Sequence, residues 1–158
     1  MKPVVKKATP AATAVLRQAT ALFPKRKKAS DGLLPSAAHQ KQNPDSDHNT
    51  GFAVDLTHDP DGGIDCFDIY EKLQKDKRVK YLIFQGKIWS AKNGESRYNG
   101  SNPHNKHIHI SIKDECGSDA SPWFPWLTVK KTPVFKTADA ARNFAMKLKP
   151  LPKKEAKK

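Results

Sequence analysis

The sequence has little cysteine and no long apolar run. Of its 158 residues only Cys66 and Cys116 are cysteines, and they show no Cys-x-x-Cys spacing. Without that spacing, neither a zinc knuckle nor a disulfide framework is predicted. A single bridge between the two cysteines remains open. No apolar stretch approaches the roughly 20 residues that a membrane-spanning helix requires. We therefore expect one domain with a single core that needs no disulfide bonds.

A cleavable signal peptide is also not predicted. Lysines at the N-terminus precede an Ala/Thr-rich stretch, but Arg17 and Gln18 interrupt any apolar segment that could follow them. If the protein acts outside a membrane, another component must release it.

Acidic residues are scarce relative to basic ones. The chain has 16 Asp and Glu against 29 Lys and Arg, a formal net charge of +13. This balance favours a polyanionic partner such as nucleic acid, an anionic membrane or an acidic cell-wall polymer, although a solvated surface explains the basic tails equally well. We consider nucleic acid an unlikely partner, because the basic runs include no recognised reading element and no interleaved aromatic residues.

Alternating and helical patterns predict an α+β fold in which a small antiparallel sheet is flanked by helices. Thr9 and Pro24 bound a first helix, and Gln85-Gly86 marks the turn of a hairpin. The pattern predicts a helix over 64–78, strands over 52–57, 79–90 and 107–112, and loops over 30–49 and 91–106. We expect one folded domain over 9–120, an extension with an amphipathic helix over 121–149, and a basic disordered tail over 150–158.

Three of the six histidines lie in the short stretch NPHNKHIHISIK, beside three alternating isoleucines. Side chains alternate between the faces of a strand, so Ile108, Ile110 and Ile112 share one face, and His107 and His109 share the other. The isoleucine face is expected in the core. Taken alone, the histidine face is better explained by exposure to solvent, since exposed histidines are common.

The stretch SDHNTGFAVD changes that balance. Asp55 alternates with apolar Val54 and Leu56, so its carboxylate projects from the opposite face of the strand and needs a partner. The imidazole of His48, the carboxylate of Asp55 and one imidazole of the His107/His109 pair would give three protein ligands of the kind that catalytic zinc uses, with one position left open. An ion pair between Asp55 and a lysine is the alternative, which we consider weaker. The sequence has no His-Glu-x-x-His, which excludes the common zincin class.

These residues also resemble a known family. SDHNTGFAVD is similar to the Ser-x-His-x-x-Gly-x-Ala-x-Asp motif, and HIH to the His-x-His motif, of the zinc D-alanyl-D-alanine metallopeptidases, a superfamily that includes lysostaphin-type enzymes and the hedgehog signalling domain. The flanking residues are most similar to peptidases of bacteriophages that serve as endolysins. The resemblance extends from about Leu22 to Lys113.

The resemblance implies a role for each residue. His48, Asp55 and His109 would bind one Zn²⁺, and His107 would be the catalytic group beside the metal-bound water. His104 matches a further active-site histidine of the histidine-rich branch of the family, but a loop histidine is an equal alternative. No glutamate stands three residues before His107 or His109, so the glutamate base of the other branch is missing.

The implied function is hydrolysis of peptide bonds in peptidoglycan, either as an L-alanyl-D-glutamate or D-alanyl endopeptidase or as a carboxypeptidase. A phage endolysin would stay in the host cytoplasm until released and then act on the cell wall as a monomer, with its basic segments contacting anionic wall or membrane. The alternative is a zinc-containing binding module of the hedgehog type without catalysis.

Overall fold

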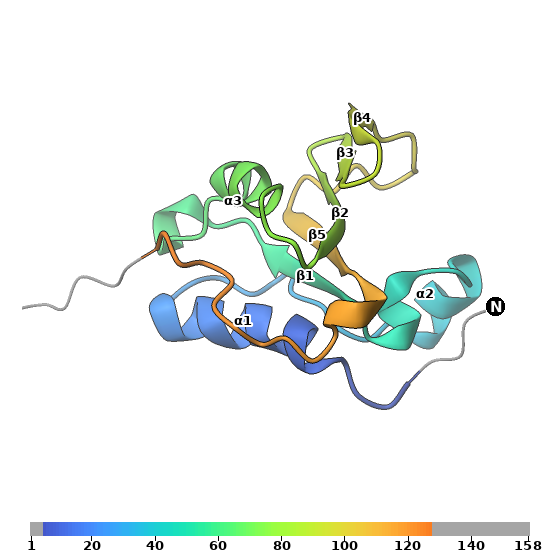
Figure 1. The fold of residues 1–158 in the computed structure, drawn as a ribbon, viewed down its shortest axis with the longest axis horizontal. Helices are drawn as coiled ribbons and strands as arrows, with labels where there is room; N and C mark the ends of the chain where they lie inside the picture. The colour runs from blue at the N-terminus through green and yellow to red at the C-terminus, as the bar shows by residue number, and fades with distance from the viewer. Residues whose placement is uncertain (1–4, 128–158) are drawn as a thin grey trace, which may run out of the picture. The chain divides into compact units, whose positions relative to one another are not determined.

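The computed structural model of the protein describes residues 5–127. Its strands are β1 (Ala53–Thr57), β2 (Val79–Phe84), β3 (Lys87–Ser90), β4 (Gly94–Arg97) and β5 (His107–Ile112). Its helices are α1 (Pro10–Leu22), α2 (Ala37–Gln42) and α3 (Cys66–Leu73), with 3₁₀ turns η1 (Asp47–Thr50), η2 (Pro60–Gly62) and η3 (Asp114–Cys116). The strands form one antiparallel sheet in the order β1-β5-β2-β3-β4 (Figure 1). The predicted α+β class with a small antiparallel sheet is confirmed. None of the helices within residues 5–127 has both the length and the apolar character to cross a bilayer.

The first helix begins and ends where the sequence predicts. The side chain of Thr9 accepts a hydrogen bond from the backbone N–H of Ala12, and Pro10 occupies the first turn. The buried face of α1 consists mainly of alanine: Ala11, Ala12, Ala14, Val15 and Ala19. Because these side chains are small, the helix axis can lie close to β1, which it contacts.

One face of the sheet forms the core. Ile108, Ile110 and Ile112 are fully buried, as their alternation predicts, and they join an apolar cluster with Val54 and Leu56 of β1. Helices α1 and α3 and strand β2 supply most of the rest, together with Ile64, Trp123 and Phe124. Each buried aliphatic side chain contributes about 1.5–3 kcal/mol relative to exposure. Asp55 and His109 alternate with these residues and therefore project from the other face.

The helix α3 is shorter than the predicted 64–78. It begins after the N-cap Asp65, whose carboxylate accepts from the N–H of Phe67, and it ends at Leu73. The next residues turn instead, because the carboxylate of Asp76 accepts hydrogen bonds from both the backbone and the side chain of Arg78. Local polar contacts of this kind compete with helical hydrogen bonds.

The hairpin of β2 and β3 forms around the predicted turn, where Gln85 and Gly86 both adopt positive φ angles of 52° and 74°. Strand β4 was not predicted, since its sequence lies in the Gly/Asn/Ser-rich stretch that we assigned to a loop. It pairs with β3 along its whole length, yet all its residues are exposed, so it has no apolar alternation to reveal it.

The predicted loop over 30–49 also contains helical structure. Ser36 caps α2 and Ser46 caps η1, each accepting a hydrogen bond from a backbone N–H two or three residues later. These serines favour both a cap and a turn, and neither helix is long enough to show an apolar period. The prediction of an irregular loop was therefore wrong in this stretch.

The segment that follows β5 packs back onto the domain. Trp123 is fully buried, and its indole N–H donates to the carbonyl of Ala11 at 2.9 Å. The Arg78 guanidinium lies 3.6 Å from the centre of the Trp123 ring and donates to the carbonyls of Ser121 and Pro122. Residues 121–127 thus lie in the same compact unit as the sheet. The helix predicted near the end of the extension and the tail over 150–158 lie outside the described residues.

Replacing Arg78 tests how strongly this contact network holds the fold. Arg78→Ala should lower the free energy of unfolding by about 3–5 kcal/mol, because it leaves Asp76 and several carbonyls without their partner. Urea unfolding of full-length protein measures this. Arg17→Ala, an exposed arginine on α1, should change stability by at most about 0.5 kcal/mol. Equal losses in the two variants would contradict the interpretation.

The two cysteines should differ in reactivity, since both are unpaired but only Cys66 is buried. Burial raises the pKa of the Cys66 thiol to about 12, so almost no thiolate is present at pH 8. In the native Cys116→Ser variant we expect a thiol reagent to label Cys66 at least 100-fold more slowly than after unfolding. Equal rates in native and unfolded protein would show that Cys66 is accessible.

Candidate functional site

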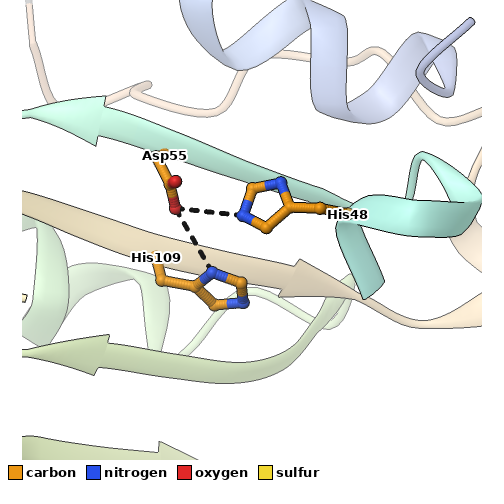
Figure 2. A group of neighbouring side chains, drawn as sticks. All are labelled: His48, Asp55 and His109. Carbon is orange, nitrogen blue, oxygen red and sulfur yellow. Dashed lines mark hydrogen bonds and ion pairs between the residues drawn. The ribbon is translucent and has the colours of Figure 1, made fainter. Parts of the chain in front are cut away.

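Three side chains converge on the face of the sheet opposite the core. His48 comes from η1, Asp55 from the middle of β1 and His109 from β5. One nitrogen of each imidazole and one carboxylate oxygen all lie within 4.8 Å of one another. Figure 2 shows both rings pointing toward the Asp55 carboxylate. These three residues could hold a metal ion, as the spacing of the two motifs predicts.

The loop geometry before β1 orients His48. Ser46 caps η1 through the N–H of His48, and Gly51 ends the turn with a φ of 78° in the left-handed region. The Nδ1 of His48 donates to the carbonyl of Leu33 at 2.7 Å. Because a carbonyl only accepts, this contact fixes the proton on Nδ1 and turns Nε2 toward Asp55, 3.2 Å from its Oδ1.

Asp55 lies at the centre of the cluster. Its Oδ1 is 3.2 Å from Nε2 of His48 and 3.2 Å from Nδ1 of His109. Burial alone would raise the pKa of Asp55, but the hydrogen bonds and charges of the two histidines outweigh it and hold the pKa far below its usual value. The carboxylate therefore stays ionised. Gly32 lies against it, where an added Cβ would come within 3.4 Å of Oδ2.

The same interactions act on His48 in the opposite direction. Burial lowers the pKa of His48, but the hydrogen bond and the charge of Asp55 together outweigh burial. The pKa of His48 therefore lies above its usual value. Asp55 thus favours a positive charge on His48. That preference is the one expected of a cation site.

His109 is held on both sides of its ring. Its Nδ1 faces Asp55, and its Nε2 lies 2.8 Å from the hydroxyl of Ser111. The ring of Tyr81 stacks on it, with ring centres 5.3 Å apart and planes at 18°. Ser111 and Tyr81 were not among the predicted site residues.

His107 and His104 lie at the edge of the cluster. Nε2 of His107 is 3.7 Å from Oδ1 of Asp55. Burial lowers the pKa of His107 despite the opposing charge of Asp55. The ring of His104 is 4.8 Å from that of His107 and 5.8 Å from that of His109, measured between centres. Both predicted residues therefore adjoin the cluster of His48, Asp55 and His109.

The backbone of His104 adopts an uncommon conformation, with φ of 61°. Its Nδ1 donates to the carbonyl of Asn102 at 2.7 Å, which holds the ring over the site. Burial, and then the nearby imidazoles, lower the pKa of His104 to about 4. His104 is therefore a neutral ring at the edge of the cluster near pH 7.

A cleft of about 530 Å³ opens over these residues. Besides the predicted histidines and Asp55, its walls include His39 of α2, Tyr81 and Ile83 of β2, and Tyr98. His39 lies in the predicted loop over 30–49, and no motif around His39 or the two tyrosines indicates a role in the site. His58 lies elsewhere: its Nδ1 accepts from the N–H of Cys66.

Comparison with known proteins gives one family. No curated protein and no solved structure matches the chain. The family model described as "VldE, C-terminal domain" matches residues 5–109, about two thirds of the chain. This range contains the three helices, strands β1 to β4 and the first half of β5. It also contains all three residues of the cluster. The chain therefore belongs to the VldE C-terminal domain family.

Proposed function

We propose that the protein is a zinc metallopeptidase that cuts peptide bonds of peptidoglycan, acting as a phage endolysin in host lysis. The observation that carries the proposal is the convergence of His48, Asp55 and His109 beside His107 in an open cleft. The resemblance of both motifs to zinc D-alanyl-D-alanine metallopeptidases points to the same reaction. The cluster fits a catalytic rather than a structural site, because it has three ligands and no thiolate.

The donor atoms fit zinc in kind and in spacing. Zinc bonds to histidine nitrogen and carboxylate oxygen are about 2.0–2.2 Å long, so two ligand atoms of a tetrahedral site lie roughly 3.3 Å apart. Oδ1 of Asp55 lies 3.2 Å from the facing nitrogen of His48 and 3.2 Å from that of His109. The contact from His48 to the carbonyl of Leu33 is the kind of outer contact that metal-bound histidines make.

A division of labour follows for the side chains. Bound zinc would supply a Lewis acid for the scissile carbonyl and lower the pKa of a water molecule toward neutrality. His107 lies beside the ligands, and burial lowers its pKa. It would accept a proton from water and return it to the leaving amine. His104, which adjoins His107, is placed to hold the substrate carbonyl or assist that transfer.

Open space on several sides of the cluster favours an endopeptidase over a carboxypeptidase. A second cavity of about 220 Å³ shares His39, His48 and Asp55 with the main cleft, and a third of about 370 Å³ shares Asn102 and His107. An extended peptide could continue in both directions from the scissile bond. The net charge of +13 would bring the protein to an anionic wall or membrane surface.

Asp55→Asn tests the metal centre. Wild-type protein should take up one Zn²⁺ per chain, and the variant should bind it at least about 100-fold more weakly, because an amide replaces the anionic ligand. Competition with a chromophoric chelator measures the affinity, and circular dichroism checks the fold. Asp61→Asn, which removes an exposed carboxylate, is the matched control and should bind zinc like the wild type. Wild-type protein without bound zinc would refute this part of the proposal.

His107→Ala tests catalysis separately from binding. The variant should keep its zinc but hydrolyse muropeptides about 10²–10⁴-fold more slowly, because the proton acceptor beside the metal is lost. Mass spectrometry of muropeptides with and without chelator measures the rate and identifies the bond. His58→Ala, outside the cleft, should retain activity if it remains folded. Zinc-loaded wild-type protein that leaves every muropeptide uncut would favour the binding module instead.

A further inference from the structure

The hydroxyl of Ser111 is buried next to the metal-binding group. Ser111 is 0% exposed, and its Oγ lies 2.8 Å from Nε2 of His109, on the side of the ring away from Asp55. Among the described side chains, Ser111 is the hydrogen-bonding partner that the structure gives to this nitrogen. A polar side chain in the middle of a sheet, with no contact to solvent, calls for a reason.

The two histidines of the cluster are held by different kinds of partner. His48 donates to a backbone carbonyl, that of Leu33, which can only accept. His109 instead meets a hydroxyl, which has one proton to donate and two lone pairs to accept with. The tautomer of His48 is thus set by the main chain, whereas the hydroxyl of Ser111 can either donate to a bare Nε2 of His109 or accept from its Nε2–H.

An irregularity in β2 brings Tyr81 to the same place. Val79 pairs with Ile112 and Tyr81 with Ser111, so β2 has one more residue than β5 in this interval. The extra residue, Lys80, is a bulge that reverses the alternation. Val79 and Leu82 consequently both face the core, and Tyr81 faces the site, where it stacks on His109.

We propose that Ser111 is a positioning residue for His109, and that Tyr81 braces the same ring. The hydroxyl of Ser111 accepts the Nε2–H of His109, so that Nδ1 presents its lone pair toward Asp55. The stacked ring of Tyr81 prevents the imidazole from rotating out of this orientation. The inference rests on the proposed metal centre and does not depend on which bond is hydrolysed.

The physical reason is the two-fold ambiguity of an imidazole ring. Without a partner for Nε2, a neutral ring exchanges its proton between the two nitrogens and turns about the Cβ–Cγ bond. Only one of these states offers Nδ1 as a ligand. A buried group that accepts the Nε2–H stabilises this state and thereby increases metal affinity without touching the metal, as outer partners of metal-bound histidines commonly do.

Ser111→Ala in the full-length protein is the primary test. We expect zinc affinity to fall by about 10- to 100-fold, with an unchanged thermal midpoint within a few degrees. The ring ¹⁵N shifts of His109 should move from one defined pair in wild-type protein toward the average of a free neutral imidazole. Ser96→Ala, at an exposed serine of β4, is the matched control and should change neither quantity.

Tyr81→Phe and Tyr81→Leu separate stacking from the hydroxyl. Phenylalanine keeps the stacked ring and should stay within about threefold of the wild-type zinc affinity, whereas leucine should lose about tenfold. Ser111→Ala protein with wild-type affinity and wild-type His109 shifts would overturn the inference. Wild-type protein that takes up no zinc would refute the proposed function instead, and the ring shifts of His109 would then decide the inference alone.

Discussion

The pairing of β1 with β5 is the constraint on which the site depends. In the observed register Asp55 lies opposite His109, and Leu56 lies opposite Ile108. A shift by one residue would bring the imidazoles into the apolar core and expose the isoleucines, at a cost of about 1.5–3 kcal/mol for each aliphatic side chain. Burial of apolar side chains on one face therefore sets the distances between polar side chains on the other.

The electrostatics of the cluster point to a cation. A carboxylate oxygen only accepts hydrogen bonds, and a neutral imidazole nitrogen that faces it must either carry a proton or oppose it with a lone pair. In His48 the proton lies on Nδ1, which donates it to the carbonyl of Leu33. Nε2 therefore faces Asp55 with a lone pair unless the ring is charged. Protonation of the ring, seen as a raised pKa, is one way to satisfy the group. A metal ion bound by the same three atoms is the other, and it leaves both rings neutral.

Several elements of the fold could be predicted because they show a strong local pattern. Alternation in 107–112, the capped α1 and the Gln85-Gly86 turn each satisfy a rule that needs no tertiary contact. Strand β4 and helix α2 were not predicted, because neither has an apolar face. His48, Asp55 and His109, which could hold a metal ion, were predicted from their motifs. Tyr81 was not, since only the bulge at Lys80, a property of the β2–β5 pairing, places it in the site.

The ligands of the site come from segments that meet only when the domain folds. His48, Asp55 and His109 span 62 positions of the chain, and the contacts that orient them involve Leu33 and Ser111. An unfolded chain cannot present this arrangement, so a metal ion would bind the folded state and stabilise it, by about 2.7 kcal/mol at a free concentration of 100 Kd. The buried polar cluster lowers the stability of the domain when no metal is bound, and a bound metal ion would raise it. The same coupling explains why the partners of the rings matter: a ring held in the binding state needs no further ordering when the metal arrives.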